Sequence, residues 1–145
     1  QHYTFTQEQE HTSDCPLAIE VDAYLYEPNA SILKAGAYRS LTQTYGVKKL
    51  HASSHLYTSS HFIEDFPGRR FQVEAVSGFG KKGLKDFLQG MDKANLTIRN
   101  FPSSVAELRK RLKLKEGGED YLFATTLADE SKVLIKCKKV PSLLH

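Results

Sequence analysis

Three of the six histidines, His51, His55 and His61, lie within eleven residues of one another and are the first candidates for a metal site. Two histidines four residues apart form a metal site when they share one face of a helix. These histidines fall instead in a serine-rich segment that we expect to be extended, where this spacing does not bring them together. No cysteine or flanking carboxylate completes a set of four ligands, so the sequence does not predict a metal site.

Acid–base and nucleophilic chemistry have equally little support. Glu64 and Asp65 are adjacent, so along a strand they would point to opposite faces and would not form an acid–base pair. The serines do not occur in a G-x-S-x-G motif, which marks the nucleophile of many hydrolases. We therefore identify no catalytic residue in this chain.

Glycines 78, 80 and 83 in the segment SGFGKKG have the composition of a phosphate-binding loop. They lack the spacing G-x-x-x-x-G-K-[ST] of a nucleotide-binding P-loop, so we interpret them as a tight turn between a strand and a helix. Lys81 and Lys82 at the start of that helix could still meet a phosphate, because helix N-termini favour anions.

Basic side chains are the strongest signal in the chain. The net charge is only +3, but residues 1–66 hold four Lys/Arg against eight Asp/Glu, whereas residues 67–145 hold sixteen against nine. Such asymmetry favours an acidic partner for the second half, with nucleic acid the usual one, although an acidic neighbour within a larger protein would explain it equally well. The candidate RNA-binding residues are Arg69, Arg70, Lys81, Lys82, Lys85, Arg99, Arg109, Lys110 and Lys113, with Lys136 and Lys138 as further members of the basic set.

Residues 94–113 must position much of this set. Residues 94–100 alternate apolar and polar side chains, which predicts a half-buried strand, and Pro102 ends it. Ser104 and Glu107 fit the capping box S-x-x-E at the start of a helix. Val105, Leu108 and Leu112 then form one apolar stripe, and Arg109, Lys110, Arg111 and Lys113 cover the remaining surface.

The rest of the second half predicts the order β-α-β-α-β-β. Residues 70–76 alternate as a strand, and residues 81–91 carry apolar side chains at helical spacing. Residues 121–127 and 132–140 read as two further strands joined by a short turn. Two β-α units favour parallel strand pairing, followed by a terminal hairpin.

The first half predicts a mixture of strands and one helix. Residues 24–26 look extended, Asn29 is a suitable N-cap, and residues 30–45 have helical periodicity with Gly46 after the end. Residues 47–60 read as one or two strands with a serine-rich turn. The charge changes sign near residue 66, which predicts two units, 1–66 and 67–145, in an α/β (α+β) fold.

The chain totals exclude several other classes of protein. A hydrophobic content of 40% and a charged content of 26% over 145 residues are typical of a folded globular chain. No apolar run approaches the length of a membrane span, and the N-terminus is unlike a signal peptide. Cys15 and Cys137 have no metal or redox spacing, and Cys137 is expected in the core, so we expect a cytoplasmic location and no membrane partner.

Three segments carry a family resemblance: YLYEPNASILKAGAYRSL at 24–41, KKLHASSHLYTS with DFPGRRFQVEAV at 48–59 and 65–76, and KANLTIRNFPSSVAELRKRLKLKEGGEDYLFATTL at 93–127. They resemble the C-terminal region of a family of bacterial class I S-adenosylmethionine-dependent methyltransferases. The resemblance implies a small ferredoxin-like segment at 1–66 and a THUMP-like domain at 67–145. In that family a Rossmann-like catalytic domain precedes both.

The resemblance implies an accessory role. The chain has no glycine-rich S-adenosylmethionine loop, no acidic ribose ligand and no Asn-Pro-Pro-Tyr-type motif, and it does not begin with Met. We therefore expect a piece of a longer methyltransferase, with no cofactor of its own and S-adenosylmethionine bound by the parent protein. The expected partners are structured RNA (tRNA or rRNA) and the methyltransferase domain of the same protein. The alternative is a scaffold without an RNA role, which docks that domain or a second subunit.

Overall fold

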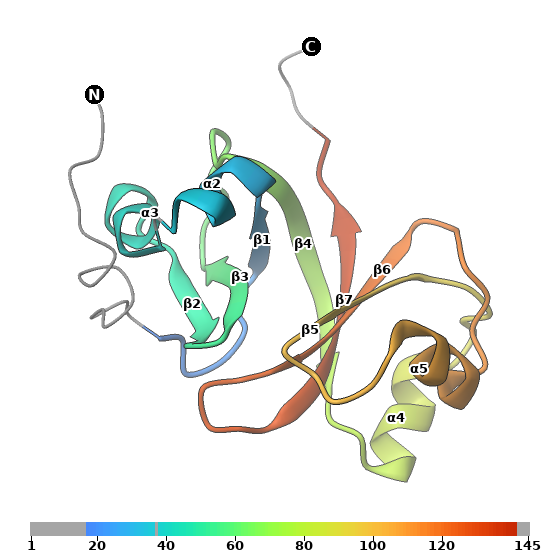
Figure 1. The fold of residues 1–145 in the computed structure, drawn as a ribbon. Helices are drawn as coiled ribbons and strands as arrows, with labels where there is room; N and C mark the ends of the chain where they lie inside the picture. Colours follow the sequence, from blue (N-terminus) through green and yellow to red (C-terminus); the bar gives the residue numbers. More distant parts are fainter. Residues whose placement is uncertain (1–16, 37, 142–145) are drawn as a thin grey trace.

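The computed structural model describes residues 17–36 and 38–141 and has a mixed α+β fold (Figure 1). Within these residues, seven strands form one sheet in the order β2-β3-β1-β4-β7-β6-β5. The strands are β1 Tyr24–Pro28, β2 Lys48–His51, β3 Ser54–Ser59, β4 Gly68–Ser77, β5 Asn95–Arg99, β6 Asp120–Thr126 and β7 Lys132–Lys139. The helices are α2 Ala30–Ala35, α3 Tyr38–Tyr45, α4 Lys81–Leu88 and α5 Val105–Leu112.

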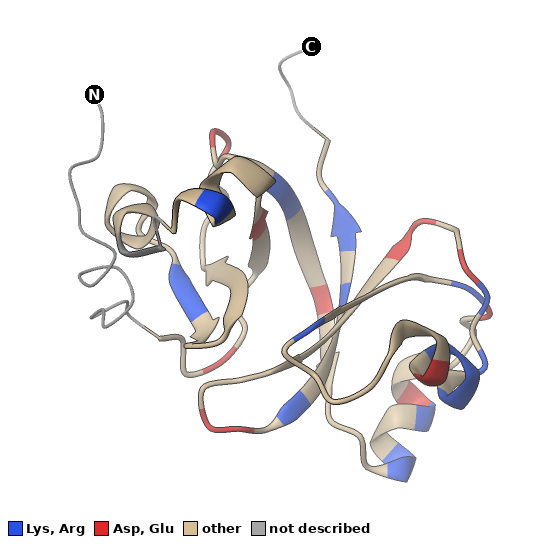
Figure 2. Cartoon of the chain, viewed as in Figure 1, with Lys and Arg blue, Asp and Glu red and all other residues tan. Residues whose placement is uncertain are grey.

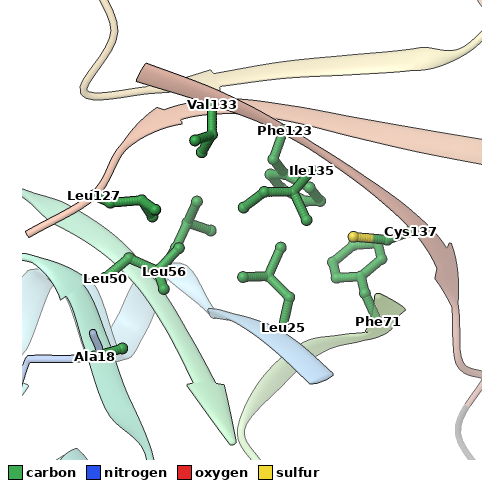
Figure 3. Packing of buried hydrophobic residues seen from close by; sticks show 10 residues of the cluster. All are labelled: Ala18, Leu25, Leu50, Leu56, Phe71, Phe123, Leu127, Val133, Ile135 and Cys137. Atoms are coloured by element: carbon green, nitrogen blue, oxygen red, sulfur yellow. The ribbon is translucent and has the colours of Figure 1, made fainter. Parts of the chain in front are cut away.

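The sheet is strongly curved, and its inner face encloses a shared core. Strands β3 and β5 are far apart in the sheet order, yet they contact each other. Figure 3 shows side chains from both halves of the chain converging there, among them Leu25 of β1, Leu56 of β3 and Phe123 of β6. Cys137 belongs to this core, as predicted, and burial raises the pKa of its thiol.

Helices cover the outer face of the sheet in two places. Successive side chains of a strand point to opposite faces, so Phe123 lies in the inner core whereas Leu122 and Ala124 pack under α4 and α5. Leu108 and Leu112 of α5 complete that second cluster. On the first half, Tyr26, Leu41, Val47, Tyr57, Ile63 and Phe66 form a third cluster beneath α2 and α3.

Helix α5 begins at the predicted capping box. The Ser104 Oγ accepts a hydrogen bond from the Glu107 N–H, and a Glu107 carboxylate oxygen accepts one from the Ser104 N–H, both at 3.1 Å. Both hydrogen bonds satisfy N–H groups that a helix start leaves unpaired. Leu108 and Leu112 are buried as expected, but Val105 is 41% exposed, so the apolar stripe begins one turn later than predicted.

The end of α5 provides a stability prediction. Lys113 is the C-cap and adopts the left-handed conformation at φ 58°, where a side chain costs free energy that glycine avoids. We expect Lys113→Gly to raise the free energy of unfolding by about 0.5–1 kcal/mol, measured in urea. The matched variant Lys110→Gly lies inside the helix and should lower it by about 1 kcal/mol. If both variants changed the free energy of unfolding in the same direction, the left-handed conformation of Lys113 would not be a source of strain.

The predicted helix over residues 30–45 is wrong as one element. It is divided into α2 and α3, because Gly36 has φ 68° and its N–H donates to the Leu33 carbonyl oxygen, which caps α2. Asn29 is the N-cap, as predicted, and its side chain accepts from the Ile32 N–H. Gly36, which lies inside the predicted range 30–45, is thus the stop signal of the first helix.

The predicted parallel pairing is half right. Strands β5 and β6 pair in parallel across α5, but β4 does not pair with β5. Strand β7 instead lies between β4 and β6 and pairs antiparallel with both. The element order β-α-β-α-β-β is confirmed, and residues 47–60 form the two strands β2 and β3. The predicted division at residues 66–67 stays a prediction, and Cys15 lies outside the described residues.

Candidate nucleic-acid interface

Helices α4 and α5 bring five of the predicted RNA-binding lysines to one part of the surface. Both helices pack on the same apolar cluster, and Figure 2 shows their basic segments at the same corner of the molecule. All five side chains are exposed, and none forms a hydrogen bond or ion pair with the residues that the structure describes. We call this set the basic helix face; it consists of Lys81, Lys82, Lys85, Lys110 and Lys113.

Arg111 extends this face and was missing from the predicted RNA-binding set. Its guanidinium carbon lies 5.1 Å from the ring centre of Phe79, the residue that precedes α4 by two positions. The Phe79 ring packs on Phe101 with ring centres 5.2 Å apart. These contacts join the segment before α4 to the segment before α5 and to the last turn of α5, and they hold a cation over an aromatic ring. The signal in the sequence was a phenylalanine shortly before each helix, two residues before α4 and four residues before α5.

Arg69 and Arg99, also predicted to bind RNA, are held by a carboxylate instead. Glu27 of β1 has only 11% of its side chain exposed. Its Oε1 accepts from the Arg69 Nε at 2.8 Å, and its Oε2 accepts from Arg99 at 2.7 Å. Gly68 allows the backbones of β1 and β4 to approach closely, because a Cβ there would lie 2.1 Å from the Glu27 carbonyl oxygen. The ion pairs therefore connect β1, β4 and β5.

Arg70 and Arg109 also point their charge at the protein. Arg70 is 9% exposed, donates to the Glu64 carbonyl oxygen and lies over the Phe62 ring. Arg109 donates to the Ala94 carbonyl oxygen at 3.2 Å and lies 3.9 Å from the Glu116 carboxylate. Outside the RNA-binding set, Lys138 pairs with Asp120 at 2.7 Å. Because these cations already contact groups of the protein, they are less available to a phosphate than the lysines of the basic helix face.

His51 contacts a carboxylate and a backbone N–H, and His55 lies near two cations. The His51 Nε2 lies 2.8 Å from a Glu130 carboxylate oxygen, and its Nδ1 accepts from the Ser53 N–H. For His55, burial and then the neighbouring Lys49 and Arg99 charges lower the pKa of the imidazole. In the described ranges, no group of three His, Cys, Asp or Glu side chains could hold a metal ion.

The glycines at 78, 80 and 83 have the spacing G-x-G-x-x-G of a dinucleotide-binding turn, which the structure does not support. In such a turn, glycines permit close approach of backbone and ligand within a parallel sheet. Here a Cβ at Gly78 or Gly80 would meet nothing within 4 Å. Strand β4 is flanked by antiparallel neighbours on both sides. The segment forms the tight β4–α4 turn predicted from the sequence, and it places Lys81 and Lys82 on the basic helix face.

Comparison with known families identifies two domains in the chain. A ferredoxin-like domain model matches residues 24–67, and a THUMP domain-like model matches residues 68–139. The chain therefore contains a ferredoxin-like domain followed by a THUMP-like domain. A search of curated proteins finds no match.

A solved structure shares this architecture at 42% sequence identity. It is the crystal structure of a "putative methyltransferase from Porphyromonas gingivalis W83", with a TM-score of 0.84. The match covers 94% of this chain and 34% of that chain, so the present chain spans about a third of the length of that protein. Among the described helices, none is long and apolar enough to cross a membrane.

Proposed function

We propose that this chain is the accessory region of a methyltransferase and that it binds structured RNA through the basic helix face. The observation that carries the proposal is the set of five exposed lysines on α4 and α5 that have no acidic partner among the described residues. Lysine side chains that stay unpaired in the protein can neutralise phosphates and release their counterions. The THUMP-like domain, which contains both helices, supports RNA as the polyanion.

The methyltransferase part of the proposal comes from the similar structure and from the sequence resemblance. The reaction and its S-adenosylmethionine would belong to a catalytic domain outside this chain, in the cytoplasm. The accessory region would hold the RNA backbone and present the target nucleotide to that domain. Phosphate contacts of this kind set position and orientation, and the shape of the RNA would supply the selectivity.

A salt titration tests RNA binding directly. With tRNA or an rRNA hairpin labelled for fluorescence anisotropy, we expect affinity to fall about 100- to 500-fold between 50 and 200 mM salt. This range corresponds to about five phosphate contacts. Heparin, a polyanionic polysaccharide without nucleobases, serves as the control for charge alone. No binding at either salt concentration, or affinity that does not change with salt, would contradict the proposal.

A docking role is the second candidate, and one feature favours it. Ile19 is 94% exposed, and Glu20 and Asp22 lie beside it in a shallow pocket at the edge of β2. An apolar side chain flanked by carboxylates could contact the methyltransferase domain or a second subunit. Under this alternative, loss of the basic helix face would leave the RNA affinity of the full-length protein unchanged.

A further inference from the structure

A polar hollow lies between the loop that leads from β5 to α5 and the turn that joins β6 to β7. It has a volume of about 530 Å³, within the range of small-molecule sites. It is lined by Asn100, Phe101, Pro102, Thr126, Glu130 and Lys132. An aromatic ring and a proline thus lie beside an amide, a hydroxyl, a carboxylate and an ammonium group.

The backbone around the polar hollow is held in an unfavourable conformation. Asn100 has φ 55° and Glu130 has φ 71°, and these are two of the three non-glycine residues with positive φ among those described. Asparagine tolerates this region, but glutamate does so at a cost that glycine would remove. Backbone strain of this kind is concentrated at binding and catalytic sites.

The hydrogen bonds of His51 fix what the polar hollow offers to a ligand. The His51 Nδ1 accepts from the Ser53 N–H at 2.9 Å, so its Nε2 carries the proton and donates to Glu130. The atom of Asn100 that lies 3.2 Å from the same Nδ1 must then be its amide nitrogen. Neither the Asn100 Oδ1 nor the Glu130 Oε1 forms a hydrogen bond within the described ranges.

Two acceptor oxygens beside an aromatic ring suit one class of ligand. A phosphate is disfavoured, because the Glu130 carboxylate repels it. A nucleobase with an exocyclic amino group has N–H donors for both oxygens and a flat face for the Phe101 ring. Uracil has no amino group and presents carbonyl acceptors at that position. Lys132 at the same hollow can meet a ring or carbonyl acceptor of the base.

The geometry points to the polar hollow as the binding site for an unpaired, amino-bearing nucleobase of the RNA. This inference rests on the proposed function for its biological ligand. Phe101 connects the two surfaces, because its ring packs on Phe79, over which Arg111 of α5 lies. An RNA whose backbone follows the basic helix face could therefore place one unpaired base in the polar hollow.

Nucleosides test the inference without any phosphate. In NMR titrations of the 145-residue chain, cytidine should shift the amide signals of Asn100, Phe101 and Ser131 and bind about five- to tenfold more tightly than uridine. Glu130→Gln should reverse this order, because its carbonyl oxygen keeps the His51 contact while its NH₂ becomes a donor toward the ligand. Phe101→Leu should weaken both nucleosides equally.

Asp129→Asn is the matched control, because it removes the same charge one residue away but does not line the polar hollow. It should leave the cytidine preference unchanged. No shift at tens of millimolar, equal binding of both nucleosides, or a preference that survives Glu130→Gln would overturn the inference. Since nucleosides carry no phosphate, the outcome is independent of the basic helix face. Cytidine binding without salt-dependent RNA binding would count against the proposed function alone.

Discussion

Replacing Glu27 by glutamine is expected to lower the free energy of unfolding by about 2 kcal/mol. The substitution keeps the size of the side chain but removes the charge that pairs with Arg69 and Arg99. Breaking a fully buried pair costs about 3–5 kcal/mol. Here the two arginine side chains are 39% and 42% exposed and can regain water, which reduces the expected loss.

The control for this prediction lies in the same sheet. Glu74 is an exposed residue of β4 without an ion pair among the described residues, so Glu74→Gln should change the free energy of unfolding by less than about 0.5 kcal/mol. Urea unfolding of both variants, followed by far-UV circular dichroism, measures the difference. If Glu27→Gln unfolded at the wild-type urea concentration, the three charges would not hold β1, β4 and β5 together.

Local signals in the sequence predicted much of the fold. The capping box at Ser104 and Glu107 depends on residues three positions apart, and it forms as expected. The serine-rich turn between β2 and β3 is equally local. The strand order was not accessible in this way, because β7 pairs with β4 about sixty residues earlier in the chain. Periodicity identifies a strand and its faces but does not identify its neighbour.

The candidate interface shows the same division between local and distant information. The apolar period of residues 81–91 leaves Lys81, Lys82 and Lys85 on the polar side of their helix, and they are exposed. In the sequence, Arg69 and Arg99 cannot be told from these exposed cations. Their partner Glu27 lies 42 and 72 residues away along the chain, so no local pattern reveals the ion pairs. A residue type reports charge, and only the fold reports whether that charge is already paired. The break at Gly36 escapes prediction for a different reason: the helical periodicity of residues 30–45 continues through this glycine, whereas its left-handed φ ends the first helix.

Three lysines of the basic helix face, replaced together, are expected to have the largest effect on RNA binding. The variant Lys82→Gln, Lys85→Gln, Lys110→Gln removes three unpaired cations from α4 and α5. At 50 mM salt we expect a loss of affinity on the order of 100-fold. The slope of log K against log salt should become shallower by about 2–2.7, since each lost phosphate contact contributes about 0.7–0.9.

A second triple variant separates this effect from net charge. This variant replaces three exposed lysines outside the basic helix face, on α2, β2 and β7: Lys34→Gln, Lys48→Gln and Lys139→Gln. Its total charge equals that of the first triple variant. A diffuse attraction between the chain and RNA would weaken equally in the two variants. A localised interface would lose the steep salt dependence only in the first variant. Equal losses would therefore remove α4 and α5 as the contact surface, whereas no loss in either variant would favour the docking role.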